Sequence, residues 1–217
     1  SNIKVWYDKD KQGIRMVVMQ YHESFQVYSN RSFEDVNGLI ELIRKKSPHC
    51  ISARREIIEI IEEKLPQYFS EYGVIMENPQ INLKNDYNVN SMYRTKIREA
   101  DIIDCEKITD LIFTSPEISA PYTKEVLLEE LKERIQTGMG RSFIIENADE
   151  VVAHVATYAE TESFVIVGGF VVHPDFRDSE YAYHLEKFIA DIINREGKKH
   201  VGMITSRRLQ RMFERKG

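Results

Sequence analysis

GGFVVHPDFRDSEYAYHL, residues 168–185, joins an apolar run to an amphipathic segment through a short loop. This pattern is typical of a strand that leads into a helix. The first turn of a helix offers unpaired N–H groups and a partial positive charge, so such a junction attracts phosphate. Phosphate-binding loops usually place glycines after the arginine, whereas Arg177 is followed here by Asp178, Ser179 and Glu180. The segment is therefore either a phosphate cradle without its glycines or an ordinary loop.

The composition is that of a globular protein. Its 217 residues, 42% of them hydrophobic, suffice for one large domain or two small ones. No run approaches the roughly 18 apolar residues of a membrane span, so a cytoplasmic protein without membrane contact is expected. The net charge of -5 argues against a broad nucleic-acid-binding surface. Cys50 and Cys105 stand far apart without CxxC spacing, so neither a disulfide framework nor a metal site is expected.

An asparagine-rich segment divides the chain into two unequal parts. Residues 78–93, NPQINLKNDYNVNSMY, have no apolar periodicity and are typical of a linker. We expect an N-terminal α/β domain over 1–77, a linker over 78–92 and a second domain over 93–217. The elements expected in the first domain are a hairpin of strands at 3–8 and 14–29, helices at 33–46 and 53–65, and strands at 49–53 and 72–78.

The second part has a different order of elements. Asp104 and Thr123 are suited to cap two amphipathic helices, and Gly138 is suited to end the second of them. The expected elements are a strand at 91–100, helices at 104–113 and 124–138, strands at 141–147, 150–160 and 163–172, a helix at 179–196, a strand at 200–205 and a helix at 206–216. This order predicts a mixed α/β (α+β) fold around a central sheet.

With HPDFR leading into a helix, this order resembles the GNAT superfamily of acyl-CoA-dependent N-acetyltransferases over residues 93–217. The resemblance implies a mostly antiparallel sheet flanked by helices, whose fourth strand splays from its neighbour and pairs with the pantetheine arm. A loop of pattern [QR]xxGx[GA] then wraps the pyrophosphate. The implied activity is transfer of an acetyl group from acetyl-CoA, as cosubstrate, to an unidentified amine by direct attack in a ternary complex.

The resemblance also implies which residues bind the coenzyme. They are Phe170, Val171 and Val172 on the strand, Arg177, Asp178, Ser179, Glu180, Tyr181 and Ala182 in the loop and helix start, and Arg207 near the C-terminus. Arg207 lies in a basic segment that would equally serve as the solvated face of a terminal helix.

Two positions depart from the family pattern. Glu180 replaces the loop glycine, and both Asp178 and Glu180 would compete with the pyrophosphate for the helix N–H groups, so weaker coenzyme binding is expected. Phe213 stands where the family has a tyrosine that protonates the leaving thiolate, and a phenyl ring has no proton to donate.

Acetyl transfer to an amine needs a base or a water chain, and a donor for the oxyanion. The expected donor is a backbone N–H near Val171 or Val172. The candidate bases are Glu160 and Glu162, in the turn before the fourth strand, and His154 within the preceding strand. The alternatives are solvated turn carboxylates and a hydrogen-bonded, half-buried histidine.

Other interpretations remain open from the sequence. The first alternative is a catalytically degenerate GNAT-fold binding or regulatory module, which Glu180 and Phe213 favour. The second is a nucleic-acid-binding protein that uses the basic C-terminal segment. More narrowly, the chain resembles GNAT proteins whose N-terminal half is itself a degenerate acetyltransferase-like unit, with 49–53, 53–65 and 72–78 as its remnant elements.

Overall fold

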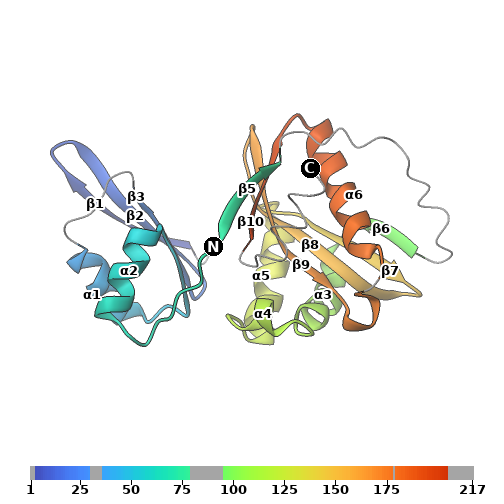
Figure 1. Ribbon diagram of the computed structural model, residues 1–217, viewed down its shortest axis with the longest axis horizontal. Helices are drawn as coiled ribbons and strands as arrows, with labels where there is room; N and C mark the ends of the chain where they lie inside the picture. The colour runs from blue at the N-terminus through green and yellow to red at the C-terminus, as the bar shows by residue number, and fades with distance from the viewer. Residues whose placement is uncertain (1–2, 30–35, 79–94, 178, 205–217) are drawn as a thin grey trace. The chain divides into compact units, whose positions relative to one another are not determined.

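The structure, a computed structural model, describes residues 3–29, 36–78, 95–177 and 179–204. The chain forms two compact units, Ser1–Tyr72 and Gly73–Gly217 (Figure 1). Each unit combines a β-sheet with helices, so the predicted mixed α/β fold is confirmed. No helix within these ranges is long and apolar enough to cross a membrane.

The first unit is a four-stranded sheet with two helices. Its elements are β1 (Ile3–Asp10), β2 (Gly13–Tyr21), β3 (Ser24–Ser29), α1 (Asn37–Lys46), β4 (Cys50–Ser52) and α2 (Arg55–Lys64). The strands lie in the order β1-β2-β3-β4, and only β3 and β4 are parallel. Phe25 of β3 is buried in one core with Ile43 of α1 and Ile61 of α2. The run expected as one strand at 14–29 is two strands, because a turn with His22 at a φ of 50° divides it.

The second unit contains a six-stranded sheet. Its elements are β5 (Val74–Asn78), β6 (Thr95–Glu99), the 3-10 turn η2 (Ile102–Asp104), α3 (Cys105–Ile112), α4 (Pro116–Ser119), α5 (Lys124–Thr137), β7 (Ser142–Asn147), β8 (Glu150–Glu160), β9 (Phe164–Val172), the 3-10 turn η3 (Pro174–Phe176), α6 (Tyr181–Arg195) and β10 (Lys199–Ile204). The strand order is β5-β10-β9-β8-β7-β6. Among these described strands, only β9 and β10 form a parallel pair.

Helices cover both faces of this sheet (Figure 1). On one face, Leu185 and Ile189 of α6 are buried in a cluster with Phe143 of β7 and other strand residues. On the other face, Ile108 of α3 and Leu131 of α5 are buried in a second cluster with strand residues. The sheet is therefore the middle layer of three. A strand residue packs against α6 or against α3 and α5, according to the face of the sheet on which its side chain lies.

One expected element lies in the other unit. The strand predicted at 72–78, as part of the 1–77 domain, is β5, which pairs antiparallel with β10 of the six-stranded sheet. The division between the units accordingly falls between Tyr72 and Gly73. An apolar run predicts a strand but does not say which sheet edge it will cover. The predicted linker, 78–92, lies outside the described residues except at Asn78.

Candidate active site

The ladder between β9 and β10 stops before β9 ends. β10 pairs with β9 as far as Gly202 opposite Val167, whereas β9 runs on to Val172. On its other side β9 stays paired with β8 up to Val172 opposite Ala153. From residue 168 to residue 172, one edge of β9 therefore has no strand partner in the described part of the chain. We call this edge, residues 168–172, the open edge.

The backbone groups on the open edge follow from the alternation along a strand. The N–H of His173 donates to the carbonyl of Val152 on β8 at 2.8 Å. Successive residues of a strand turn their N–H and C=O groups to opposite sides. Val171 therefore faces β8, and Phe170 and Val172 face the open edge. Of the two donors expected from the sequence, Val172 lies on the open edge and Val171 does not.

A β-bulge lies at the start of the open edge. The pairing of β8 with β9 jumps from Ala156–Gly168 to His154–Val171, so Gly169 and Phe170 both lie opposite Val155. Gly169 has a φ of 65°, a conformation that glycine adopts without strain. This bulge turns the carbonyl of Gly169 out of the regular ladder.

That carbonyl is held by His154, one of the candidate bases. His154 is 1% exposed; its Nδ1 lies 3.0 Å from the Gly169 oxygen and its Nε2 lies 3.2 Å from Ser142 Oγ. Burial lowers the pKa of His154 to about 4, so the ring is neutral at pH 7. Both ring nitrogens are engaged inside the protein, which leaves neither to take a proton from a substrate.

The start of α6 follows the open edge after a short loop. Glu180 precedes α6, but its side chain accepts no helix N–H; it is 81% exposed and lies 3.6 Å from Nε2 of His184. The N–H of Tyr181 instead donates to Ser179 Oγ at 3.3 Å. The expectation that the Glu180 side chain accepts a helix N–H, and so competes directly with the pyrophosphate, is therefore wrong. Glu180 contributes only its negative charge near the start of the helix.

The other expected coenzyme residues differ in exposure. Arg177 is exposed, Ala182 is half-buried, and the Tyr181 side chain lies in the core beside the ring of Phe176. Tyr181 therefore offers a backbone group at most. The remaining positions, Asp178, Arg207 and Phe213, lie outside the described residues.

The two candidate carboxylates lie at the opposite end of β9 from the bulge. Glu160 pairs across the ladder with Val165 and accepts hydrogen bonds from Arg141 at 2.7 and 2.9 Å and from Lys198 at 3.2 Å. Burial alone would raise the pKa of Glu160, but the hydrogen bonds from Arg141 and its other donors outweigh it and lower that pKa. Glu162 is exposed in the turn. The structure thus brings neither carboxylate to the open edge.

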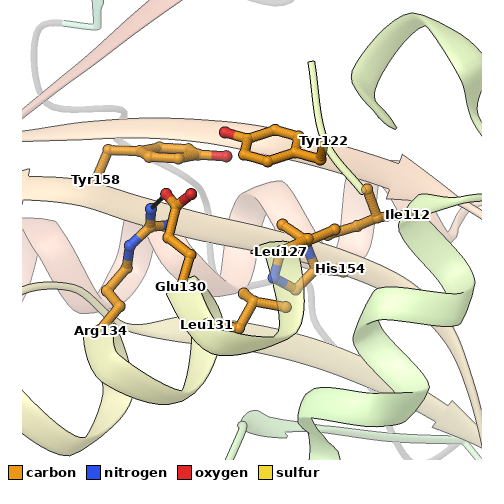
Figure 2. A pocket seen from close by; sticks show the side chains of 8 residues that line it. All are labelled: Ile112, Tyr122, Leu127, Glu130, Leu131, Arg134, His154 and Tyr158. Carbon is orange, nitrogen blue, oxygen red and sulfur yellow. Dashed lines mark hydrogen bonds and ion pairs between the residues drawn. The ribbon is translucent and has the colours of Figure 1, made fainter. Parts of the chain in front are cut away.

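A small pocket beside β8 was not anticipated from the sequence (Figure 2). It is lined by Ile112, Tyr122, Leu127, Glu130, Leu131, Arg134, His154 and Tyr158. Glu130 and Arg134 form a buried ion pair at 2.5 Å, and the Arg134 guanidinium lies 4.4 Å from the centre of the Tyr158 ring. In Figure 2 the hydroxyls of Tyr122 and Tyr158 point toward one another. The available signal was the four-residue spacing of Glu130 and Arg134 on a helix.

The chain was compared with solved structures, and the first of the three named here shares its fold. A GCN5-related N-acetyltransferase-like protein from Streptococcus suis 89/1591 is 12% identical, with a TM-score of 0.58 over 99% of this chain and 83% of that one. A predicted acetyltransferase with acetyl-CoA from Clostridium acetobutylicum is 12% identical over 57% of this chain and 88% of that one, with a TM-score of 0.48. A possible acetyltransferase from Clostridium difficile 630 is 19% identical over 50% and 77%, with a TM-score of 0.45. No curated protein matches the chain.

The sequence itself matches a family model. Residues 105–217, more than half of the chain, match the model of the acetyltransferase (GNAT) family. The matched range contains β7 to β10 and α6, and hence the open edge and the bulge. The chain belongs to the acetyltransferase (GNAT) family, whose members carry out acyl-CoA-dependent acetyl transfer.

Proposed function

We propose that this protein transfers an acetyl group from acetyl-CoA to an amine by direct attack within a ternary complex. The observation that carries the proposal is the early end of the β9–β10 ladder at Val167 and Gly202. It leaves a strand edge without a strand partner among the described residues, beside the start of a long helix. A slender chain of amides, such as pantetheine, is suited to pair with an edge of this kind.

The described residues offer suitable groups for both the pantetheine arm and the pyrophosphate of acetyl-CoA. The C=O of Phe170 and the N–H and C=O of Val172 face the open edge and match the alternating amides of pantetheine, which leaves the N–H of Phe170 for the thioester. The start of α6 carries the positive end of the helix dipole, and the exposed Arg177 adds a cation that suits the pyrophosphate. The charge of Glu180 acts against this attraction and weakens coenzyme binding.

In the reaction, a neutral amine attacks the thioester carbonyl carbon, a C–N bond forms and the C–S bond breaks. The CoA thiolate leaves and gains a proton, while the amine nitrogen loses one. The N–H of Phe170 is the donor that we assign to the oxyanion, because it lies at the bulge and faces the open edge. Glu160, Glu162 and His154 take no part in the proton transfer in this scheme, in which water takes the proton of the amine and supplies the proton of the thiolate.

Thermal unfolding with and without acetyl-CoA tests the proposal. A ligand that binds only the folded state stabilises it by about 2.7 kcal/mol at a hundredfold excess over Kd. We expect acetyl-CoA and CoA to raise the Tm, and an adenosine control without pantetheine to raise it less. Release of thiol from acetyl-CoA in the presence of a panel of amines then identifies acceptors. An unchanged Tm at millimolar acetyl-CoA would contradict the proposal and leave a GNAT fold without coenzyme binding.

A further inference from the structure

We infer that His154 is a positioning residue that orients the Gly169–Phe170 peptide so that the N–H of Phe170 faces the thioester. The inference rests on the proposed function, since it needs acetyl-CoA at the open edge. His154 touches neither substrate nor coenzyme in this account. It acts through one backbone carbonyl, that of Gly169.

The hydrogen bonds of His154 fix a single tautomer. A carbonyl oxygen only accepts, so the 3.0 Å contact with Gly169 requires a proton on Nδ1. The neutral ring then has a lone pair on Nε2, which accepts from the Ser142 hydroxyl at 3.2 Å. Ser142 and His154 are each 1% exposed, so water does not substitute for either partner. The imidazole is therefore held as an Nδ1–H donor aimed at the bulge.

The direction of the Phe170 N–H follows from the geometry of one peptide. The described chain has no cis peptide bonds, and in a trans peptide the C=O and the following N–H point in opposite directions. The imidazole of His154 holds the Gly169 carbonyl against itself, so the N–H of Phe170 points away from His154. The alternation along β9, in which His173 and Val171 face β8, places Phe170 on the side of the open edge.

Without His154 this direction would be poorly fixed. Gly169 lies in a bulge at a φ of 65°, and glycine has more conformational freedom than any other residue. A rotated peptide would present its carbonyl oxygen to the thioester carbonyl, and the two oxygens would repel. Donors that are held in place before the reaction need no reorganisation when charge develops, which is the source of their large effect on rate.

Among the described residues, His154 is the side-chain donor to this carbonyl. Arg134 pairs with Glu130, and Tyr158 lies against Gly168 with its ring and near Gly169 with its hydroxyl. Its steric contact limits where the glycine backbone lies, whereas the hydrogen bond from His154 selects which way the peptide faces.

Two matched variants separate this role from packing. In His154→Asn the side-chain amide nitrogen replaces Nδ1 and still donates to Gly169. In His154→Gln the amide lies near the position of Nε2, closer to Ser142, and the donor to Gly169 is lost. Both are neutral amides that remove the same ring, so a role in packing alone would affect them alike.

The readout is the carbonyl signal of [1-13C]acetyl-CoA bound to the full chain, observed by 13C NMR. A hydrogen bond from Phe170 polarises the thioester carbonyl and moves its signal downfield. We expect this shift in the wild type and His154→Asn, and its loss in His154→Gln, with the Kd of acetyl-CoA changed less than about threefold. Acetyl transfer, or hydrolysis of acetyl-CoA to acetate and CoA, is expected to fall about a hundredfold in His154→Gln.

The outcomes distinguish the two proposals. Equal carbonyl shifts in all three proteins, each binding acetyl-CoA, would overturn the role of His154 and leave the proposed function intact. Absence of binding to the wild type would overturn the proposed function and the inference with it. If a variant does not fold, long-range 1H–15N spectra of the wild-type imidazole decide the matter, because a proton on Nε2 instead of Nδ1 would overturn the inference.

Discussion

The ring of Tyr158 lies against Gly168, so closely that a Cβ at Gly168 would fall 2.9 Å from Cε2 of the tyrosine. At Gly169 a Cβ would fall 2.6 Å from the tyrosine hydroxyl. The glycine pair thus has a packing reason as well as a conformational one. The Tyr158 side chain therefore limits the position of the backbone at the bulge, where the open edge begins.

A double-mutant cycle tests this contact. Gly168→Ala is expected to destabilise the fold by about 1–3 kcal/mol, because the new methyl group meets the Tyr158 ring. Tyr158→Ala removes the obstacle, so the double variant should lose less than the sum of the two single losses. Chemical denaturation measures the three values. Additive losses would mean that ring and glycine do not meet.

Proline substitutions test which residues face the open edge. Val172→Pro removes an N–H that β8 does not use, so we expect the fold to persist and acetyl-CoA to bind about three- to tenfold more weakly, as for one lost hydrogen bond. Val171→Pro removes an N–H on the β8 side and should destabilise the fold by about 1–3 kcal/mol. Val172→Ala controls for lost packing. The reverse ranking of the two proline variants in stability would contradict the assigned alternation.

The charge of Glu180 is expected to weaken coenzyme binding without capping the helix. Glu180→Gln and Glu180→Gly should both tighten acetyl-CoA binding about two- to fivefold at low ionic strength, through the relieved repulsion at the helix start. Calorimetry at two salt concentrations measures the effect, which should shrink with added salt. A gain in Glu180→Gly alone would assign the effect to glycine's backbone freedom, and no gain in either would place the pyrophosphate elsewhere.

Glu160 is expected to matter for stability and not for proton transfer. The folded state lowers the pKa of Glu160 below its ordinary value of 4.5, so its ion pair with Arg141 stabilises the fold fully above that pH and less as the pH falls. Glu160→Gln should therefore lower stability by roughly 1–3 kcal/mol at pH 7 and much less near pH 3. Its acetyl-transfer rate at a temperature where it is folded should stay within about twofold of the wild type. A loss of rate without a loss of stability would instead restore Glu160 as the base.

The sequence predicted the elements that local patterns encode. Thr123 accepts from the N–H of Val126 at the start of α5, and Gly138 ends that helix at a φ of 68°, as the residue types indicate. The strand with the glycine pair and the helix after HPDFR are β9 and α6. These features depend on residues that are close in sequence, so the sequence alone was sufficient to predict them.

Features that depend on partners far apart in sequence could not be predicted from local patterns. The position of Glu160 before β9 made it a candidate base, but its partners Arg141 and Lys198 lie far from it in sequence, just before β7 and β10. The role of His154 depends on a carbonyl fifteen residues away, and β5 depends on β10 for its sheet. Contacts between segments far apart in sequence decide each of these cases, and a single sequence does not specify them.

Amide hydrogen exchange shows whether acetyl-CoA pairs with the open edge of β9. Phe170 and Val172 are assigned to the coenzyme side of β9, and Val171 is already paired with β8. Measured by NMR on the full chain, saturating acetyl-CoA should slow exchange of the Phe170 and Val172 amides by about tenfold or more and leave Val171 nearly unchanged. Unchanged exchange at Phe170 and Val172, with acetyl-CoA bound, would contradict the claim that the coenzyme pairs with this edge.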